Sequence, residues 1–265
     1  MSRPVYPAPT PGVPRITQSE LNTFLVCGMR WLFEQESAHR RATVRMVVGT
    51  AVAAGAAADN RHKAQRGEGL PLSDIVERAV TGYEEEVEET EIPESTLEVA
   101  KGKDEAADAA RVYGLKVSPL NEEVLYAEHA VVSPVGDFEL AGTPDVVTSF
   151  GVGDGKVGRA WRQDEADRSS QLDAYGILHR AQLGAYPQRL WIDSVFESPK
   201  GWSAVRLYTH RKPEHYLAFV RMAESVLKAI SAGVFLPASE RAWQCSAAWC
   251  PHWRTCPIGQ RRALA

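Results

Sequence analysis

The sequence has no long apolar run, and this absence excludes whole classes of protein. The 265-residue chain contains no unbroken apolar stretch of about 18 residues, roughly the length that spans a bilayer. Its first residues, MSRPVYPAPTPGVPR, also lack the apolar core of a secretory signal. We therefore expect no membrane partner and place the protein in the cytoplasm.

An excess of positive charge is also missing. The formal net charge is −4, so composition alone does not indicate a nucleic-acid binder. A local basic groove can nevertheless bind nucleic acid within an acidic protein. The densest acidic run, Glu84 to Glu91, predicts a solvated helix face that points away from any such groove.

Cysteine is scarce, and the four cysteines are unevenly placed. Cys27 stands alone, whereas the segment CSAAWCPHWRTC contains Cys245, Cys250 and Cys256. Without a secretory signal, a disulfide framework is not expected. Four soft thiolates suit an iron–sulfur cluster or zinc, and this compact segment would gain stability from a metal. The alternative is a set of buried free thiols.

What the chain does contain is enough apolar residues, 44%, for one large domain. We expect a flexible proline-rich leader over 1–15 and a single domain over 16–265. Thr17 followed by Glu20 is a capping-box pattern, which predicts a helix that includes Cys27. Hydrophobic spacing predicts three more helices before the middle of the chain, at about 46–65, 72–90 and 94–115.

The hydrophobic period then changes from helical spacing to two. This predicts three consecutive strands between about 123 and 157. A helix over about 168–184, a hairpin around the turn SPKG and a helix over about 213–233 follow. The order predicts an α/β or α+β domain, with a central mixed β-sheet flanked by helices.

The segment AGTPDVVTSFGVGDGK, residues 141–156, places unusual charge in a hairpin. Asp154 and Lys156 are two residues apart in a strand, so their side chains share a face. Pairing across the turn TSFGVG would bring Asp145 toward them. Two carboxylates held together repel each other unless a cation lies between them.

A hard ion such as Mg²⁺ or Mn²⁺ would satisfy both carboxylates with oxygen ligands. A nearby ammonium would orient a metal-bound water or stabilise charge on a phosphate. Together these groups are suited to metal-assisted hydrolysis of a phosphodiester. On spacing alone, the alternative is that Asp145 and Asp154 are ordinary turn aspartates beside glycine.

Several motifs resemble those of one nuclease family. Residues 144–145, PD, followed by residues 154–156, DGK, resemble the PD-(D/E)xK motif. Gln171 and Tyr175 in SSQLDAY resemble the QxxxY motif of the RecB-like branch. SELNTFLVCGMRWLF is similar to the opening helix of that branch, and CSAAWCPHWRTC to its terminal cysteines. The branch includes CRISPR-associated exonucleases, AddB-type helicase-nucleases and small phage exonucleases.

The resemblance implies a restriction-endonuclease-like fold and a metal-dependent DNA exonuclease, active in recombination, repair, or CRISPR or phage DNA processing. It implies that Asp145 and Asp154 bind the catalytic Mg²⁺ or Mn²⁺, and that Lys156 serves the attacking water and the phosphate. Gln171 and Tyr175 would contact the DNA backbone or steady the site. A [4Fe–4S] cluster would join the N-terminal helix to the C-terminus through Cys27, Cys245, Cys250 and Cys256.

The same resemblance makes DNA the expected substrate, as single strands or duplex ends. It also implies a helicase, recombinase or integrase subunit as the protein partner. We expect Lys156, Arg159, Arg162 and Arg168 to form a local basic strip that offsets the negative total charge.

One position departs from the family pattern. The family places a metal-binding histidine in the second helix within a GxxxH motif, but here Gly49 is followed by Ala53. Alanine cannot bind a metal, His62 falls on the opposite side of the helix, and Asn60 is about two turns away on the same face. Glu128, expected on a strand entering the same sheet, is the spare carboxylate and a further candidate metal ligand. The site is therefore weakened, repaired from elsewhere or abolished.

Three functions remain open on the sequence alone. They are a metal-dependent exonuclease, a nuclease-fold protein that binds DNA without cutting it, and an iron–sulfur scaffold subunit that contacts a helicase or integrase. Cleavage with Mg²⁺ or Mn²⁺ separates the first from the others, and salt-dependent binding without cleavage indicates the second.

Overall fold

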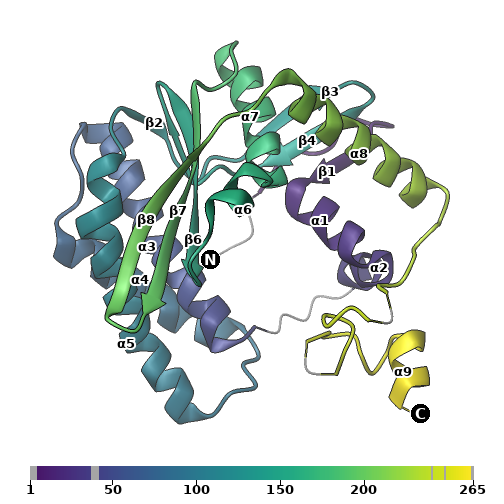
Figure 1. Ribbon diagram of the computed structural model, residues 1–265, viewed down its shortest axis with the longest axis horizontal. Helices are drawn as coiled ribbons and strands as arrows, with labels where there is room; N and C mark the ends of the chain where they lie inside the picture. The colour runs from purple at the N-terminus through teal and green to yellow at the C-terminus, as the bar shows by residue number, and fades with distance from the viewer. Residues whose placement is uncertain (1–4, 37–41, 240, 248, 264–265) are drawn as a thin grey trace.

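The computed structural model describes residues 5–36, 42–239, 241–247 and 249–263. Figure 1 shows two β-sheets, with helices packed on both faces of the larger one. The strands are β1 Arg15–Thr17, β2 Val124–Tyr126, β3 Val131–Val135, β4 Phe138–Gly142, β5 Val146–Thr148, β6 Gly151–Gly158, β7 Arg189–Ser198 and β8 Gly201–Thr209. No described helix is both long and apolar enough to cross a membrane.

The α-helices surround these strands. They are α1 Gln18–Val26, α2 Gly28–Glu36, α3 Val44–Arg66, α4 Leu72–Glu89, α5 Thr96–Val112, α6 Gln163–Asp167, α7 Ser170–Leu183, α8 Pro213–Ser231 and α9 Pro257–Ala263. Two short helical turns, η1 Tyr113–Val117 and η2 Ser118–Leu120, follow α5. Five of these helices, α3, α4, α5, α7 and α8, lie where hydrophobic spacing predicts them, whereas α6 and α9 were not expected.

The larger sheet has the strand order β2-β5-β6-β7-β8. β6 and β7 are parallel, and every other neighbouring pair is antiparallel. Trp191 and Ile192 in β7 are fully buried, as expected for a central strand covered on both faces. α3 packs on one face of this sheet and α7 on the other. The mixed sheet expected from the sequence is therefore present.

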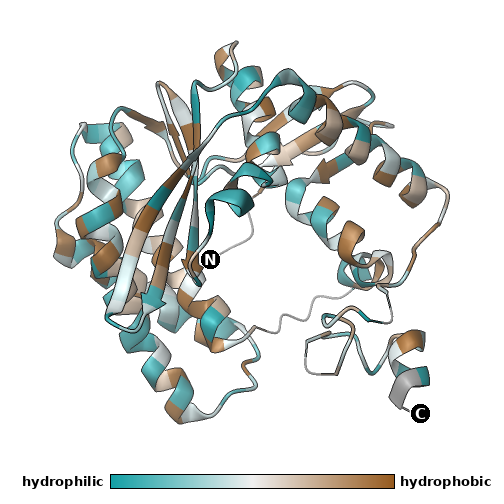
Figure 2. Cartoon of the chain, in the orientation of Figure 1, coloured by the Kyte–Doolittle hydropathy of each residue, from teal (hydrophilic) through white to brown (hydrophobic). Residues whose placement is uncertain are grey.

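The smaller sheet has the order β1-β4-β3 and shares a core with the larger one. Leu172 and Leu178 of α7 pack in one buried cluster with Leu140 of the smaller sheet and Ile192 of the larger. Figure 2 shows hydrophobic residues along the inner faces of strands and helices, and hydrophilic residues on the outer helix faces. α7 therefore joins the two sheets at the centre of the molecule.

The first helix is interrupted at Cys27, where the sequence predicts a continuous helix. Its start is as expected, because Thr17 and Glu20 form the capping box. Cys27, however, caps α1 with an extended backbone, and α2 begins at the next residue. Gly28 lies against the backbone of Leu236, and its N–H donates to the Leu236 carbonyl at 2.8 Å. This tertiary contact lies at the break, and local helix propensity does not reveal it.

The middle of the chain is more finely divided than predicted. Five strands, β2 to β6, replace the three expected, and β3 and β4 leave to form the smaller sheet with β1. Glu128 lies in the bend after β2 instead of on a strand, because its φ of 50° is left-handed. In the acidic run, Glu86 is only 2% exposed, which corrects the expectation of a wholly solvated face.

The proline-rich residues before β1 lie against the smaller sheet. Arg15, the first residue of β1, pairs with Glu139 of β4 at 2.6 Å. Further toward the N-terminus, the hydroxyl of Tyr6 lies 3.0 Å from the hydroxyl of Thr143, just after β4. This segment therefore reaches the loop that leads into β5.

Candidate functional site

Asp145 and Asp154 lie at neighbouring strands of the larger sheet. Asp145 immediately precedes β5, and Asp154 lies within β6. Because Val146 pairs with Gly153 in this antiparallel ladder, the next register position sets Asp145 beside Asp154. The backbone N–H of Gly155 donates to Oδ2 of Asp145 at 2.7 Å and holds that carboxylate against β6.

Lys156 extends from the same strand face as Asp154. Its Nζ lies 2.7 Å from Oδ2 of Asp154, a residue that is only 1% exposed. The ring of Trp161 lies 6.0 Å from the ammonium, within range of a cation–π attraction. Burial lowers the pKa of Lys156, but the charges of Asp154 and Asp145 outweigh that effect and raise it above its ordinary value. Lys156 therefore stays a cation at neutral pH.

Asp145, Asp154 and Glu128 form an acidic cluster whose potential negative charge exceeds the one positive charge of Lys156. Burial raises the pKa of Asp145 well above its ordinary value, and the charges of Asp154 and Glu128 raise it further. Burial also raises the pKa of Glu128 to about 7, with Arg61 opposing the shift and Asp154 adding to it. Burial raises the pKa of Asp154 as well, although Lys156 opposes that shift. The cluster therefore favours protons or an added cation.

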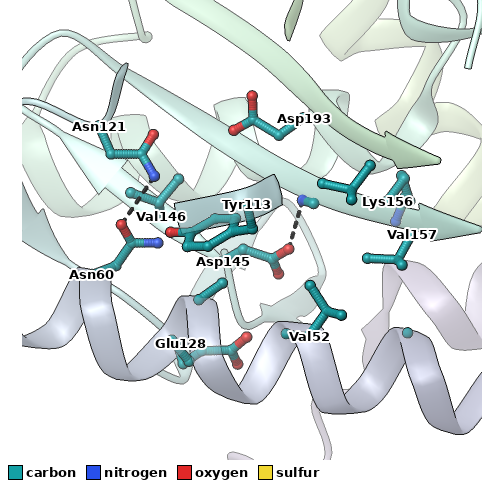
Figure 3. Close-up of a pocket in the computed structure, with 16 residues that line it drawn as sticks. Val52, Asn60, Tyr113, Asn121, Glu128, Asp145, Val146, Lys156, Val157 and Asp193 are labelled. Carbon is teal, nitrogen blue, oxygen red and sulfur yellow. Dashed lines mark hydrogen bonds between the residues drawn. The ribbon is translucent and has the colours of Figure 1, made fainter. Parts of the chain in front are cut away.

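Glu128 joins this cluster from the bend after β2. Its backbone N–H donates to the carbonyl of Pro144 at 3.1 Å, which ties the bend to the residue before Asp145. Figure 3 shows the carboxylates of Glu128 and Asp145 in the space beside α3. The spare carboxylate expected from the sequence therefore lies near the pair.

Glu128, Asp145 and Lys156 line a cavity of about 150 Å³ between α3 and the larger sheet (Figure 3). One face of α3 supplies small side chains to its wall, at Gly49, Ala53, Ala56, Ala57 and Asn60. Ala53 thus lines the cavity at the position where the sequence pattern expects a metal-binding histidine. His62 does not replace it, because its Nδ1 contacts the carbonyl of Glu68 at 2.8 Å.

Gln171 and Tyr175 of α7 connect Lys156 to the turn that carries Asp145. Nζ of Lys156 donates to Oε1 of Gln171 at 2.7 Å, and Nε2 of Gln171 donates to the Tyr175 hydroxyl at 2.9 Å. That hydroxyl donates to the carbonyl of Thr143 at 3.1 Å. Burial raises the pKa of Tyr175 well above its ordinary value, so the donor stays protonated. In this arrangement the two side chains support the site.

Sequence reasoning missed a second polar group that lines the same cavity. Asp193 in β7 pairs with Arg206 in β8 through Nε and Oδ1 at 2.7 Å. Asn121 accepts a hydrogen bond from Arg206 and donates one to Asn60. The signal was present in RLWIDSVF, where one aspartate interrupts a run that otherwise reads as a buried strand.

The four cysteines line a second, smaller cavity of about 20 Å³. Sγ of Cys27 accepts the backbone N–H of Ala238 at 3.3 Å. Burial raises the pKa of the Cys250 thiol, and the neighbouring Cys256 and Cys245 raise it further. Within the part of the chain that the structure describes, no three His, Cys, Asp or Glu side chains are arranged to hold a metal ion. The four cysteines therefore converge on one cavity, and none of them forms a disulfide.

The expected basic strip is largely paired with acidic residues of α6. Arg159 lies 2.7 Å from Glu165, and Arg162 lies 3.2 Å from Asp164. Arg168 also pairs with Asp164. The expectation overlooked these acids, which lie between the arginines in the sequence. Because the arginine side chains are at least 63% exposed, the pairs are weak surface ion pairs with which a phosphate can compete.

Comparisons with known proteins identify one matching family and similar solved structures. The profile of the PD-(D/E)XK nuclease superfamily matches residues 15–257. The structure resembles that of a candidate exonuclease from Eubacterium rectale, with a TM-score of 0.55 and 9% identity over 87% of this chain and 86% of that one. The structure of SSO0001 scores 0.34 with 15% identity, over 91% of this chain and 95% of that one, too low to bear on the fold. No curated protein matches.

The likeness to the Eubacterium rectale protein, at 9% identity, speaks for the fold alone. The match to the family profile is stronger evidence of kinship. It extends from β1 to the terminal cysteine segment and includes the hairpin where Asp145, Asp154 and Lys156 meet. From this match over nearly its whole length, the chain belongs to the PD-(D/E)XK nuclease superfamily.

Proposed function

We propose that this protein is a metal-dependent deoxyribonuclease of the RecB-like branch that removes nucleotides from DNA ends. The observation that carries the proposal is the meeting of Asp154 with Lys156, next to Asp145, in a member of a nuclease superfamily; Asp145 and Lys156 line one cavity. The fold shared with a candidate exonuclease supports it. The proposed setting is cytoplasmic DNA processing in recombination, repair, or a CRISPR or phage pathway.

Mg²⁺ or Mn²⁺ is the cofactor that this set of side chains suits. Oδ2 of Asp154 is buried, and Nζ of Lys156 lies 2.7 Å from it. Hard oxygen donors match either cation. Asp145 and Asp154 would hold the ion, with Glu128 as the spare ligand. A bound ion would supply Lewis acidity and lower the pKa of a coordinated water.

The chain's own residues provide charge, orientation and a low dielectric. Lys156 is held between Asp154 and Gln171, so its ammonium is placed to stabilise negative charge on a phosphate oxygen. The Gly155 N–H orients Asp145. The apolar side chains of Val52 and other valines line the same cavity and reduce water access, which strengthens each charge interaction.

A structural [4Fe–4S] cluster is the proposed role of the four cysteines. Support comes from their presence around one cavity and from the backbone N–H that Cys27 already accepts. A cluster there would close a loop of more than 200 residues between Cys27 and Cys245. The proposed protein partner is a helicase, recombinase or integrase subunit.

A cleavage time course on end-labelled single- and double-stranded DNA tests this function, with Mn²⁺ and with Mg²⁺ in parallel. We expect progressive shortening by the wild type and none by Asp154→Ala. Asp137→Ala is the matched control, because it removes an exposed aspartate from the β3–β4 turn. Circular single strands should persist. Cleavage of circular strands as fast as of linear strands would overturn the exonuclease assignment. No cleavage of any substrate would overturn the proposed nuclease activity.

Ala53 favours one alternative, a nuclease-fold protein that binds DNA without cutting it. The side chain lines the cavity, so a potential ligand is absent from the α3 wall. DNA binding that weakens steeply with salt, with no cleavage in either metal, would support this alternative. Absence of both binding and cleavage would instead support a scaffold subunit.

A further inference from the structure

A series of hydrogen bonds ends at the cavity and leaves one amide group facing it. The series begins at Arg206, which is buried with 3% side-chain exposure and pairs with Asp193. Its Nη2 donates to Oδ1 of Asn121, and Nδ2 of Asn121 donates to Oδ1 of Asn60 at 2.9 Å. Three of these residues, Asp193, Asn121 and Asn60, line the same cavity as the acidic cluster.

The chemistry of the guanidinium fixes the orientation of both amides. A guanidinium carries only donors, so the Asn121 atom that faces Arg206 must be the oxygen. The Asn121 nitrogen then faces Asn60, and the Asn60 atom that receives it must also be the oxygen. The hydrogen bonds therefore all run from Arg206 through Asn121 to Asn60, and Oδ1 of Asn60 is used as the last acceptor.

The group that Asn60 presents to the cavity is therefore its NH₂. Asn60 is 3% exposed and lies on the same face of α3 as Ala53. Figure 3 shows its nitrogen turned away from Asn121, toward the interior of the cavity. An amide N–H cannot ligate a cation, but it is a good donor to an anion. Asp193 does not repel an anion strongly, because Arg206 pairs with it at short range.

We infer that Nδ2 of Asn60 donates a hydrogen bond to a phosphate oxygen of the DNA strand held in the cavity. This inference rests on the proposed nuclease function, which supplies the phosphate. α3 then contributes an anion-binding group about two helical turns after Ala53. The acidic cluster and Lys156 act from the side of the sheet. Asn121 and Arg206 are positioning residues that keep the amide in its donating orientation.

Asn60→Asp tests this assignment, because it keeps the size of the side chain and replaces the donor with an acceptor. We expect its dissociation constant for a single-stranded oligonucleotide in Ca²⁺, measured by fluorescence anisotropy, to rise about tenfold or more. Its affinity for Mn²⁺ without DNA, measured by calorimetry, should not fall. Gln65→Glu adds the same charge at an exposed position of α3 and serves as the control.

Asn121→Asp provides a second variant that leaves Asn60 intact. The new carboxylate can accept from Arg206 but cannot donate to Asn60, so the Asn60 amide must turn its nitrogen away from the cavity. DNA affinity should fall as it does in Asn60→Asp. Unchanged DNA affinity in both variants, or tighter Mn²⁺ and undiminished DNA binding in Asn60→Asp, would overturn the inference alone. Wild type that neither binds nor cuts DNA would overturn the proposed function itself.

Discussion

The hydroxyl of Tyr175 donates a hydrogen bond to the backbone carbonyl of Thr143 at 3.1 Å, two residues before Asp145. The same hydroxyl accepts a hydrogen bond from Gln171, which in turn accepts one from Lys156. One side chain of α7 is therefore connected both to the turn before β5 and to the ammonium on β6. Because the turn and the ammonium share this connection, a change at Tyr175 should affect both together.

Tyr175→Phe should lower cleavage and weaken divalent-ion binding while the protein stays folded. Loss of the hydroxyl frees the turn that carries Asp145, and positioning errors of about 1 Å can cost roughly a hundredfold in rate. We also expect a loss of about 1 kcal/mol of stability. Tyr83→Phe is the matched control, because its hydroxyl also donates to a backbone carbonyl, that of Val99 at 2.7 Å. Equal cleavage by both variants would contradict the positioning role.

Ala53→His should raise cleavage and lower the metal concentration needed for it. The imidazole would enter the cavity from α3 and add a third protein ligand opposite the carboxylates. Mn²⁺ accepts nitrogen ligands better than Mg²⁺, so the gain should be larger with Mn²⁺. A metal titration of the cleavage rate measures this effect.

The double change Ala53→His with Asp154→Ala should remain inactive, since the histidine cannot replace the carboxylate. If the wild type already cuts rapidly in Mg²⁺ and Ala53→His leaves the rate unchanged, another residue completes the site. Glu128 would then be the residue to mutate.

Metal-free protein should lose stability as pH rises through the titration of Glu128. Its pKa is about 7 in the folded protein, against an ordinary value of 4.5. Between these values the folded state retains a proton that the unfolded chain has released, so stability is greatest below this window and falls across it. The raised pKa values of Asp145 and Asp154 act in the same direction.

The midpoint of thermal unfolding in EDTA, measured across this pH range, checks the expectation. Glu128→Gln should flatten the pH dependence, whereas Glu122→Gln, at an exposed acid in the same segment, should not. Added Mg²⁺ should stabilise the wild type more at high pH than at low pH. A midpoint that rises through the window in metal-free protein would contradict the sign.

Gly153→Ala should destabilise the protein strongly. A Cβ at this position would lie 2.2 Å from Nε1 of Trp191, which is fully buried and donates to Asp193. Overpacking of this kind typically costs about 1–3 kcal/mol. Gly49→Ala should have the opposite sign, about 0.5–1 kcal/mol of stabilisation, because it lies in α3 and the added Cβ would meet no atom within 4 Å beyond the adjoining backbone of that helix. Urea denaturation of both variants separates these outcomes.

Protein purified without oxygen should be brown, with the broad visible absorbance of an iron–sulfur cluster. Cys250→Ser should remove the colour and reduce stability, because it removes one proposed ligand from the cysteine cavity. Ser246→Ala, in the same segment but outside that cavity, is the control. Stoichiometric zinc without iron would rule the cluster out.

Patterns with a strong local cause could be predicted from the sequence. Thr17 and Glu20 form the expected capping box, and Gly184 ends α7 in the left-handed conformation. The two-residue spacing of Asp154 and Lys156 gives the shared face, because strand geometry alone requires it. The paired strands around the turn then carry Asp145 to the same place.

Features that depend on distant contacts could not be predicted in this way. Cys27 leaves the helix where the C-terminal segment meets Gly28. The three-residue strands β2 and β5 are too short to show a period. Asn121 reaches the cavity through bonds to Arg206 and Asn60, which are far away in the sequence.

The contact between Cys27 and Ala238 also sets an order of events during synthesis. A ribosome makes Cys27 211 residues before Ala238, so Sγ of Cys27 cannot accept the Ala238 N–H until the whole intervening segment has been translated. The strands and helices between them can fold before that point. A transcript truncated just before Ala238 would therefore yield a nascent nuclease body whose first two helices lack their final anchor.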